Sequence, residues 1–174
     1  ITIRLGKGAY WDTEIKQAQQ QGLTDYPVYT LKQATDLSYQ VCVEYLLSDQ
    51  CPRLLPQFAS HNAMNLSHII SLSEQSIKPL EFQRLHGMGE ALYNEALEHT
   101  PDAQLRIYAP IGAQQQLLPY LVRRLLENGA NSSFLLQQFD SSITPEQLTA
   151  PPAEQLLALD LKRNPAIPQP TNLY

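Results

Sequence analysis

The strongest constraint on the fold is a unit that recurs four times along the chain: a short strand pattern, a polar loop and a helical pattern. The runs that predict strands fall at residues 2–5, 54–59, 82–85 and 105–108. Strands that alternate with helices are typical of parallel βα units, because parallel strands need a crossover connection between them. The sequence therefore predicts an α/β fold with a parallel sheet.

Helical periodicity follows each predicted strand. Two helical stretches, 12–21 and 31–47, follow the first strand and are separated by the turn-prone Gly22 and Pro27. Each later strand is followed by one predicted helix, at 62–72, 90–99 and 114–128. These patterns account for residues 1–139, which we interpret as one α/β unit.

The end of the chain has a different composition. Six of the 13 prolines lie there, at Pro145, Pro151, Pro152, Pro165, Pro168 and Pro170. Because proline fixes φ and removes a donor, we expect extended chain there, apart from one short amphipathic helix at 153–161. We interpret residues 140–174 as a proline-rich linker towards a missing domain.

Charge and composition exclude several function classes. The net charge of the 174-residue chain is -5, without a basic block, which argues against nucleic acid as a ligand of this segment. No run is long and apolar enough for a spanning helix, and two cysteines are too few for a disulfide framework, so we expect a cytoplasmic protein. The first residues already alternate like a strand, which suggests a cut inside a larger protein.

Polar and glycine residues gather where the predicted strands end. In parallel βα folds ligands bind at the carboxyl ends of the strands, so these segments are the candidate site. His61 lacks the neighbouring ligands of a metal site, and no metal is predicted. Lys7 fits either a Schiff-base lysine or a cation facing an anionic ligand. From spacing alone, Arg123 and Arg124 fit either a carboxylate clamp or a surface pair with Glu127, and the surface pair is the commoner case.

Five segments resemble one family in order along the chain. They are 4–12 (RLGKGAYWD), 27–35 (PVYTLKQAT), 57–63 (QFASHNA), 82–90 (FQRLHGMGE) and 106–112 (RIYAPIG), followed by 120–134 around Arg123 and Arg124. They resemble the flavin-dependent proline dehydrogenase domain of the bifunctional bacterial proline-utilisation proteins. The resemblance implies a (β/α)8 TIM-like barrel, of which this chain supplies the last four βα units.

The same resemblance implies FAD as cofactor and the oxidation of L-proline to 1-pyrroline-5-carboxylate by hydride transfer to flavin, with a quinone as the electron acceptor. Arg4 would lie near flavin N5, Trp11 would stack on adenine, and Gln83 and Leu85 would border the isoalloxazine. The remaining implied cofactor-binding residues are Gly6, Lys7, Gly8, Ala9, Thr30, Lys32, Thr35, Ser60, His61, Asn62 and Glu127.

The substrate residues are also implied by the resemblance. Arg123 and Arg124 would clamp the proline carboxylate, with Glu127 orienting them, and this favours the clamp over the surface pair. Tyr10, Tyr108 and Leu85 would wall the pyrrolidine ring. The residues implied to act in catalysis are Arg4, Tyr10, Tyr108, Arg123 and Arg124.

Several partners are implied but have no counterpart in these residues: the first half of the barrel and a downstream aldehyde dehydrogenase domain. Peripheral contact with the cytoplasmic membrane face is also compatible with a quinone acceptor. Two alternatives stay open: a Schiff-base TIM-barrel lyase that uses Lys7, and an inactive half-barrel fragment that needs its other half.

Overall fold

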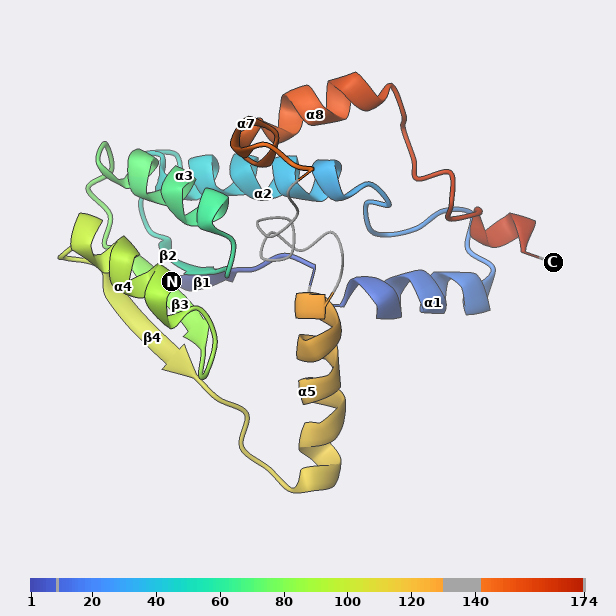
Figure 1. Ribbon diagram of the computed structural model, residues 1–174, viewed down its shortest axis with the longest axis horizontal. Coiled ribbons are helices and arrows are strands. Elements are labelled where there is room, and N and C mark those ends of the chain that lie inside the picture. Colours follow the sequence, from blue (N-terminus) through green and yellow to red (C-terminus); the bar gives the residue numbers. More distant parts are fainter. Residues whose placement is uncertain (9, 130–141, 174) are drawn as a thin grey trace.

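The computed structural model describes residues 1–8, 10–129 and 142–173. Figure 1 shows the arrangement, in which helices lie along one side of a short sheet and α5 stands apart from that layer. In chain order the elements are β1 (Thr2–Leu5), α1 (Trp11–Gln21), α2 (Lys32–Leu47), β2 (Leu55–Ala59), α3 (Ala63–Ser73), β3 (Glu81–Leu85), α4 (Glu90–His99), β4 (Gln104–Tyr108), α5 (Gln114–Gly129), α7 (Pro145–Thr149), α8 (Pro152–Leu159) and the 3-10 helix η1 (Pro170–Asn172).

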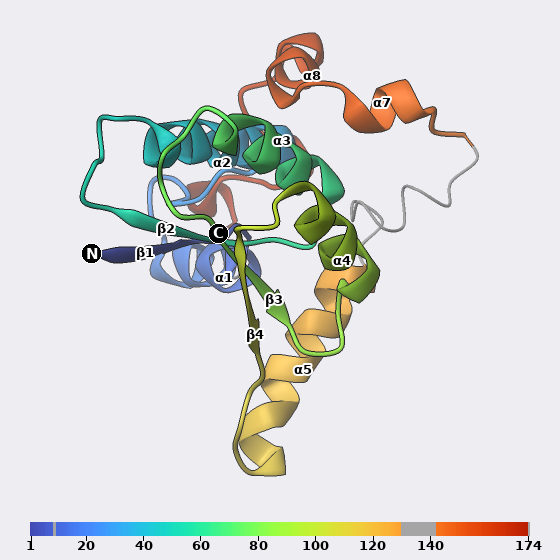
Figure 2. The same cartoon turned by 90° about the vertical axis from the view of Figure 1, so that its left-hand side faces the viewer.

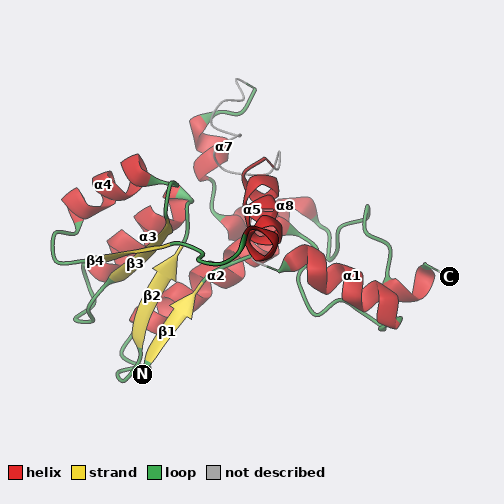
Figure 3. Ribbon diagram, turned by 90° about the horizontal axis from the view of Figure 1, so that it is seen from below, coloured by secondary structure: helices red, strands yellow, loops and turns green. Residues whose placement is uncertain are grey.

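The four strands form one parallel sheet in the order β1-β2-β3-β4. Each strand therefore pairs with its neighbour in sequence, and each crossover advances the chain by one strand (Figure 3). Among the described residues, no strand pairs with the outer edges of β1 and β4. The sheet is an open arc, and all four strand predictions agree with it to within one residue.

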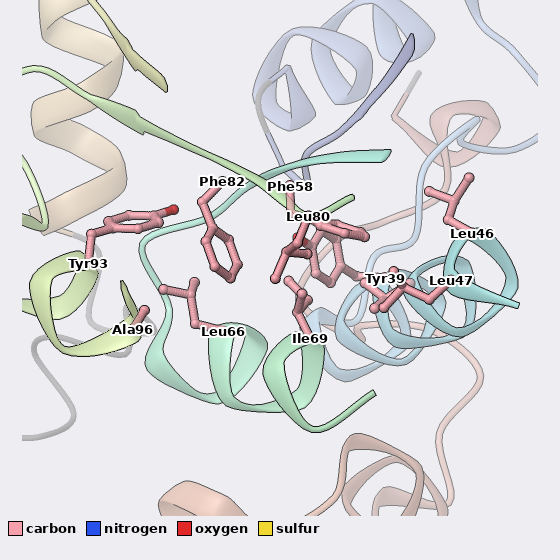
Figure 4. Packing of buried hydrophobic residues seen from close by; sticks show 11 residues of the cluster. Tyr39, Leu46, Leu47, Phe58, Leu66, Ile69, Leu80, Phe82, Tyr93 and Ala96 are labelled. Carbon is pink, nitrogen blue, oxygen red and sulfur yellow. The ribbon is translucent and has the colours of Figure 1, made fainter. Parts of the chain in front are cut away.

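The core lies between the sheet and helices α2, α3 and α4. Phe58 and Phe82 are paired in register on β2 and β3 and are fully buried. They pack with Leu66 and Ile69 of α3 and Tyr93 of α4 (Figure 4). Burial of such side chains stabilises the fold by about 1.5–3 kcal/mol each, so this layer fixes how the helices lie on the sheet. We call this covered side the outer face.

The opposite side, the inner face, is polar. Because side chains alternate along a strand, the neighbours of Phe82 on β3, Glu81 and Gln83, point away from the core. The Glu81 carboxylate accepts two hydrogen bonds from Arg106 on β4, at 2.9 Å from Nε and 3.2 Å from Nη2. It also accepts one from Gln83 Nε2 at 2.8 Å. These bonds, with Arg106 foremost, lower the pKa of Glu81 to about 2.

A single lysine organises the amino-terminal end of the sheet. Lys78 Nζ lies 2.6 Å from the carbonyl oxygen of Leu46, 2.7 Å from that of Ser48 and 2.9 Å from that of Cys51. These carbonyls belong to the end of α2 and the turn after it, where the helix dipole is negative and carbonyls lack helical partners. Lys78 thus ties the approach to β3 to the end of α2.

The proline-rich end is folded against the rest of the chain rather than extended throughout. The predicted helix is present as α8, and the structure adds α7 and η1, which periodicity did not predict. Helix α8 packs against α2 and lies directly above it in Figure 1, and η1 packs on α1. The predicted boundary at 139/140 falls outside the described residues, so the interpretation of 140–174 as a linker to a further domain stays a prediction.

In the described part of the chain, no helix has the length and apolar character needed to cross a membrane. The same residues contain no group of three or more His, Cys, Asp or Glu side chains placed to hold a metal ion.

Candidate functional site

A charged cluster links the end of β1 to the start of α2. The Lys7 ammonium forms an ion pair with Asp36 Oδ1, and Lys32 Nζ lies 2.6 Å from Asp36 Oδ2. The spacing of Lys32 and Asp36, four residues apart on α2, places them on one helix face. Burial lowers the pKa of Lys7, with Asp36 opposing that shift. Burial acts to raise the pKa of Asp36, but the Lys7 and Lys32 ammonium groups together outweigh it and lower that pKa. One carboxylate thus holds two cations side by side.

The cluster opens into a cavity of about 120 Å³ at the carboxyl ends of β1 and β2. Its floor includes Lys7, Lys32, Asp36 and Asn62, so it joins residues from the loop after β1, from α2 and from the β2–α3 loop. Two ammonium groups beside a side-chain amide are a donor set that suits a phosphate group.

The loop after β2 is held by hydrogen bonds of its own. Asn62 is the N-cap of α3, and its Oδ1 accepts from the backbone N–H of Asn65 at 3.2 Å. Ser60 Oγ accepts from the backbone N–H of Asn62 at 3.2 Å and from Asn65 Nδ2 at 3.0 Å. Because the cap uses only Oδ1, the Nδ2 group of Asn62 is the donor left for a ligand.

His61 lies between the ends of β2 and β3. Its Nε2 accepts from the backbone N–H of Leu85 at 3.3 Å, which requires the neutral tautomer with its proton on Nδ1. Burial, then the nearby Arg124 and Arg84 guanidiniums, lower the pKa of His61 and favour that neutral form. Gly89 has φ +66° and faces the ring, since a Cβ there would stand 2.9 Å from His61 Cδ2.

Tyr93 of α4 contacts the end of β2 and the middle of β3 from the helix-covered outer face. Its hydroxyl lies within hydrogen-bonding distance of the Ser60 carbonyl and at 3.1 Å from the Gln83 carbonyl. Burial raises the pKa of Tyr93 to about 12, so it stays protonated. Tyr93 therefore links β2 and β3 directly behind Ser60, His61 and Gln83.

The implied adenine region contains Trp11, the first residue of α1. Trp11 Nε1 donates to the Tyr29 carbonyl at 2.8 Å, which joins α1 to the segment before α2. Thr30 Oγ1 accepts from the backbone N–H of Asn164 at 3.0 Å, so the end of the chain reaches this segment. Thr35 lies in the first turn of α2, with its N–H bonded to the Leu31 carbonyl at 3.3 Å.

The implied substrate residues gather on the inner face and on α5. The Arg4 guanidinium lies 4.6 Å from the centre of the Tyr108 ring, although β1 and β4 are at opposite edges of the sheet. That contact requires the inner face to be concave, because flat strands would separate the two backbones by about 14 Å. Arg123 of α5 lies 6.0 Å from the centre of the Tyr10 ring. Arg124 lies close enough to His61 to lower its pKa.

The structure brings Lys7, Lys32 and Asn62 together at one cavity, and it places Arg4 against Tyr108 and Arg123 near Tyr10. Gly6 and Gly8 lie in the loop after β1, Gly8 with φ +76°, and Gln83 and Leu85 are buried on β3. Ala9 and the Glu127 side chain lie outside the described residues, so the predicted role of Glu127 in orienting the arginines stays a prediction. Asp36 and Tyr93 were not predicted from the sequence. The spacing of four residues between Lys32 and Asp36, which is typical of a helical ion pair, is the one local signal for Asp36, and Tyr93 has none.

An open arc of parallel βα units with candidate binding residues at the strand ends is the arrangement expected for part of a (β/α)8 protein. Residues 1–137 match the family described as "Proline dehydrogenase", and the chain belongs to that family. It is 48% identical to "Bifunctional protein PutA" of Salmonella typhimurium over 187 residues, which covers 100% of this chain and 14% of that protein. It is 32% identical to "Proline dehydrogenase 1, mitochondrial" of Dictyostelium discoideum, over 76% of this chain and 25% of that one.

Solved structures agree with this assignment. A variant of Proline Utilization A (PutA) from Bradyrhizobium japonicum superposes with a TM-score of 0.88 at 49% identity, covering 99% of this chain and 18% of that one. The fold-class prediction is confirmed, with the barrel left unclosed by these four strands. The chain spans about one seventh of the length of the PutA relative from Salmonella typhimurium, since it covers 14% of it.

Proposed function

We propose that the protein containing this chain is a proline dehydrogenase that oxidises L-proline to 1-pyrroline-5-carboxylate, with FAD as the cofactor and a quinone as the electron acceptor. Membership of residues 1–137 in the proline dehydrogenase family supports the reaction class. The observation that carries the proposal is the cavity at the ends of β1 and β2, where Lys7, Lys32 and Asn62 present donors to one space.

These residues fit a flavin dinucleotide. The Lys7 and Lys32 ammonium groups and the Asn62 amide suit its diphosphate, and the proton on His61 Nδ1 adds a neutral donor beside them. Trp11 suits the adenine, and Gln83 and Leu85 suit the isoalloxazine. When bound, FAD supplies the two-electron acceptor for the hydride that leaves the ring carbon next to the proline nitrogen.

The substrate is held by the chain's own residues. Arg123 and Arg124 bind the proline carboxylate through charge-assisted hydrogen bonds, and Tyr10, Tyr108 and Leu85 exclude water from the pyrrolidine ring. Arg4, with its guanidinium against the Tyr108 ring, supplies the cation that stabilises an electron-rich cofactor nearby. The product forms as the hydride leaves carbon and the ring nitrogen loses its proton.

The wider context follows from the length of the relatives. We propose that a preceding segment completes the barrel, that an aldehyde dehydrogenase domain follows, and that the protein is cytoplasmic with peripheral contact to the membrane that holds the quinone. Nucleic acid binding is not expected through this segment, which carries a net charge of -5.

A direct experiment is to purify the intact protein that contains this chain and record its visible spectrum with and without L-proline under anaerobic conditions. We expect a flavin absorption band that bleaches on addition of L-proline and returns when a quinone is added. A colourless protein, or a flavin that L-proline does not bleach, contradicts the proposal. Repeating the flavin measurement on the chain alone tests whether these four strands need the rest of the barrel.

One observation favours a second candidate function. Burial lowers the pKa of Lys7, as in Schiff-base lysines. The Asp36 ion pair argues against it, because the carboxylate stabilises the protonated amine that cannot attack a carbonyl. Borohydride trapping of a carbonyl compound on Lys7, absent in Lys7→Met, would support the lyase.

A further inference from the structure

The end of the chain forms one side of the cavity. Opposite Lys7, Lys32 and Asn62, the lining residues come from the region of α7 and α8: Ile143, Gln147, Ala150, Pro152 and Gln155. The cavity therefore lies between the strand ends and residues that follow them by 81 (Asn62 to Ile143) to 148 (Lys7 to Gln155) positions along the chain. We call residues 142–173 the C-terminal wall.

Specific contacts hold the C-terminal wall in place. Arg163 donates two hydrogen bonds to Asp25, both at 2.7 Å, and the Tyr26 hydroxyl donates to the Pro168 carbonyl at 2.7 Å. The backbone N–H of Asn164 donates to Thr30 Oγ1 at 3.0 Å. These bonds attach the wall to residues 25–30, next to the carbonyl that binds the Trp11 indole.

The two wall glutamines still have polar groups to offer a ligand. Gln147 Oε1 accepts from the backbone N–H of Thr144 at 2.9 Å, which leaves its Nε2 group as a donor. Gln155 Nε2 donates to the Ala150 carbonyl at 2.7 Å, which leaves its Oε1 as an acceptor. The wall thus offers uncharged donors and acceptors, which suit phosphoryl oxygens and ribose hydroxyls.

The size of the cavity limits what it holds. At about 120 Å³ it is smaller than the roughly 300–1,000 Å³ of pockets that enclose a whole ligand of drug size. It therefore suits one part of a dinucleotide, and the two ammonium groups on its floor select the diphosphate and the adjoining ribose.

We propose that the C-terminal wall is part of the cofactor site: Gln147 and Gln155 contact the diphosphate–ribose part of the dinucleotide, and the Arg163–Asp25 pair keeps the wall closed over it. This inference rests on the proposed function. It gives residues 142–173 a role in cofactor retention, in addition to any connection they make to a further domain.

The first test is a charge swap in the intact protein, measured as the rate of flavin release after dilution, by flavin fluorescence. Arg163→Glu places two carboxylates together, and we expect release to accelerate several-fold. The double variant Arg163→Glu with Asp25→Arg restores the pair in reverse and should restore slow release. Lys162→Glu makes the same charge change one residue away, where the described part of the chain shows no ion-pair partner to lose, and should release flavin as the parent does.

The second test places a charge on the wall itself. Gln155→Glu puts a carboxylate opposite the diphosphate, so we expect release about ten-fold faster at low salt and a smaller difference at high salt, because salt screens the repulsion. Leu157→Glu adds the same charge on the solvent side of α8, where Leu157 is 80% exposed, and should have no such effect.

The outcomes separate the two proposals. If the parent protein holds no flavin, the proposed function and this inference both fail. If the parent holds flavin and Gln155→Glu releases it no faster than Leu157→Glu does, the wall is not part of the cofactor site, and the proposed function still stands. Should Arg163→Glu fail to fold, the Gln155→Glu and Leu157→Glu pair decides alone.

Discussion

The two sides of the candidate site differ in how completely this chain builds them. On the cofactor side, Lys7, Asp36, His61 and Asn62 are each held by a named hydrogen bond or ion pair and are at least partly buried. On the substrate side, Tyr10 is 64% exposed and Arg123 stands on the exposed part of α5. The proposed cofactor side is therefore fixed by this chain, whereas Tyr10 and Arg123 of the proposed substrate side lie exposed on its surface.

The difference follows from what supports each side. Phe58 and Phe82 anchor β2 and β3 in the core, and the Tyr93 hydroxyl links the two strands through the Ser60 and Gln83 carbonyls. Helix α5 stands apart from the α2–α3–α4 layer, with Leu118 and Leu121 exposed on its apolar stripe (Figures 1 and 2). Because a packed core fixes side-chain positions, we expect the positions of the proposed substrate residues to depend on the rest of the proposed barrel more strongly than those of the proposed cofactor residues do.

The largest expected effect is on the substrate side. Arg123→Met and Arg124→Met in the intact protein should each weaken transition-state binding of proline by roughly 2–5 kcal/mol, because a desolvated carboxylate loses charge-assisted hydrogen bonds. Steady-state kinetics should show the loss mainly in KM for proline, with flavin content unchanged. Pyrrolidine, which has no carboxylate, is the control substrate; equal losses for pyrrolidine and proline would refute the clamp.

A second prediction tests the rigidity of the cofactor side with two glycines of the β3–α4 loop. Gly87→Ala forces alanine to φ near +79° with open space around its Cβ, at a cost of roughly 1–2 kcal/mol. Gly89→Ala meets the same kind of strain at φ +66° and also pushes against His61. We expect a further cost of roughly 1–3 kcal/mol from that overpacking, together with faster flavin release. Similar urea midpoints and release rates for the two variants would show that the His61 contact is unimportant.

Trp11 should give a smaller effect. Trp11→Ala removes the implied stacking surface for adenine and the hydrogen bond to Tyr29, so flavin affinity should fall by about 1 kcal/mol, or roughly five-fold. Trp11→Phe keeps an aromatic face and should recover part of that loss. Titration of the apoprotein with FAD measures the difference, and an unchanged affinity in Trp11→Ala would place the adenine elsewhere.

The smallest expected effect is a pH dependence. The pKa of His61 is lower in the folded state than the ordinary value of 6.5, so below about pH 6.5 the unfolded state takes up the proton more readily. Stability should be complete above that pH and decline as the pH falls below it. We expect the decline in the parent melting curves to weaken in His61→Gln, while His99→Gln, at an exposed histidine, should leave it unchanged.

Local sequence patterns predicted the strands and most helices, because the periodicity of each element is formed by consecutive residues. The strand at 54–59 and β2 at Leu55–Ala59 differ by one residue, since alternation and turn residues mark its ends. The packing of the end of the chain against residues 25–30 could not be predicted in this way. Arg163 and Asp25 are 138 positions apart, and the sequence around either residue does not indicate that the two form a pair. The strand-end segments identified the site region through their resemblance, whereas Asp36 and Tyr93 act through contacts made only in the folded chain.

Lys78 stabilises the amino-terminal end of the sheet, which is the end opposite to the candidate site. Its ammonium group takes the place that a bound monovalent cation would occupy among three carbonyl oxygens, but it is tethered and cannot dissociate. The candidate site lies at the other end of the strands, about 17 Å away along a strand of five residues. Stability and ligand specificity can therefore change independently. Substitutions around Lys78 would alter the stability of the fold, whereas substitutions in the strand-end loops would alter which ligand the proposed site binds.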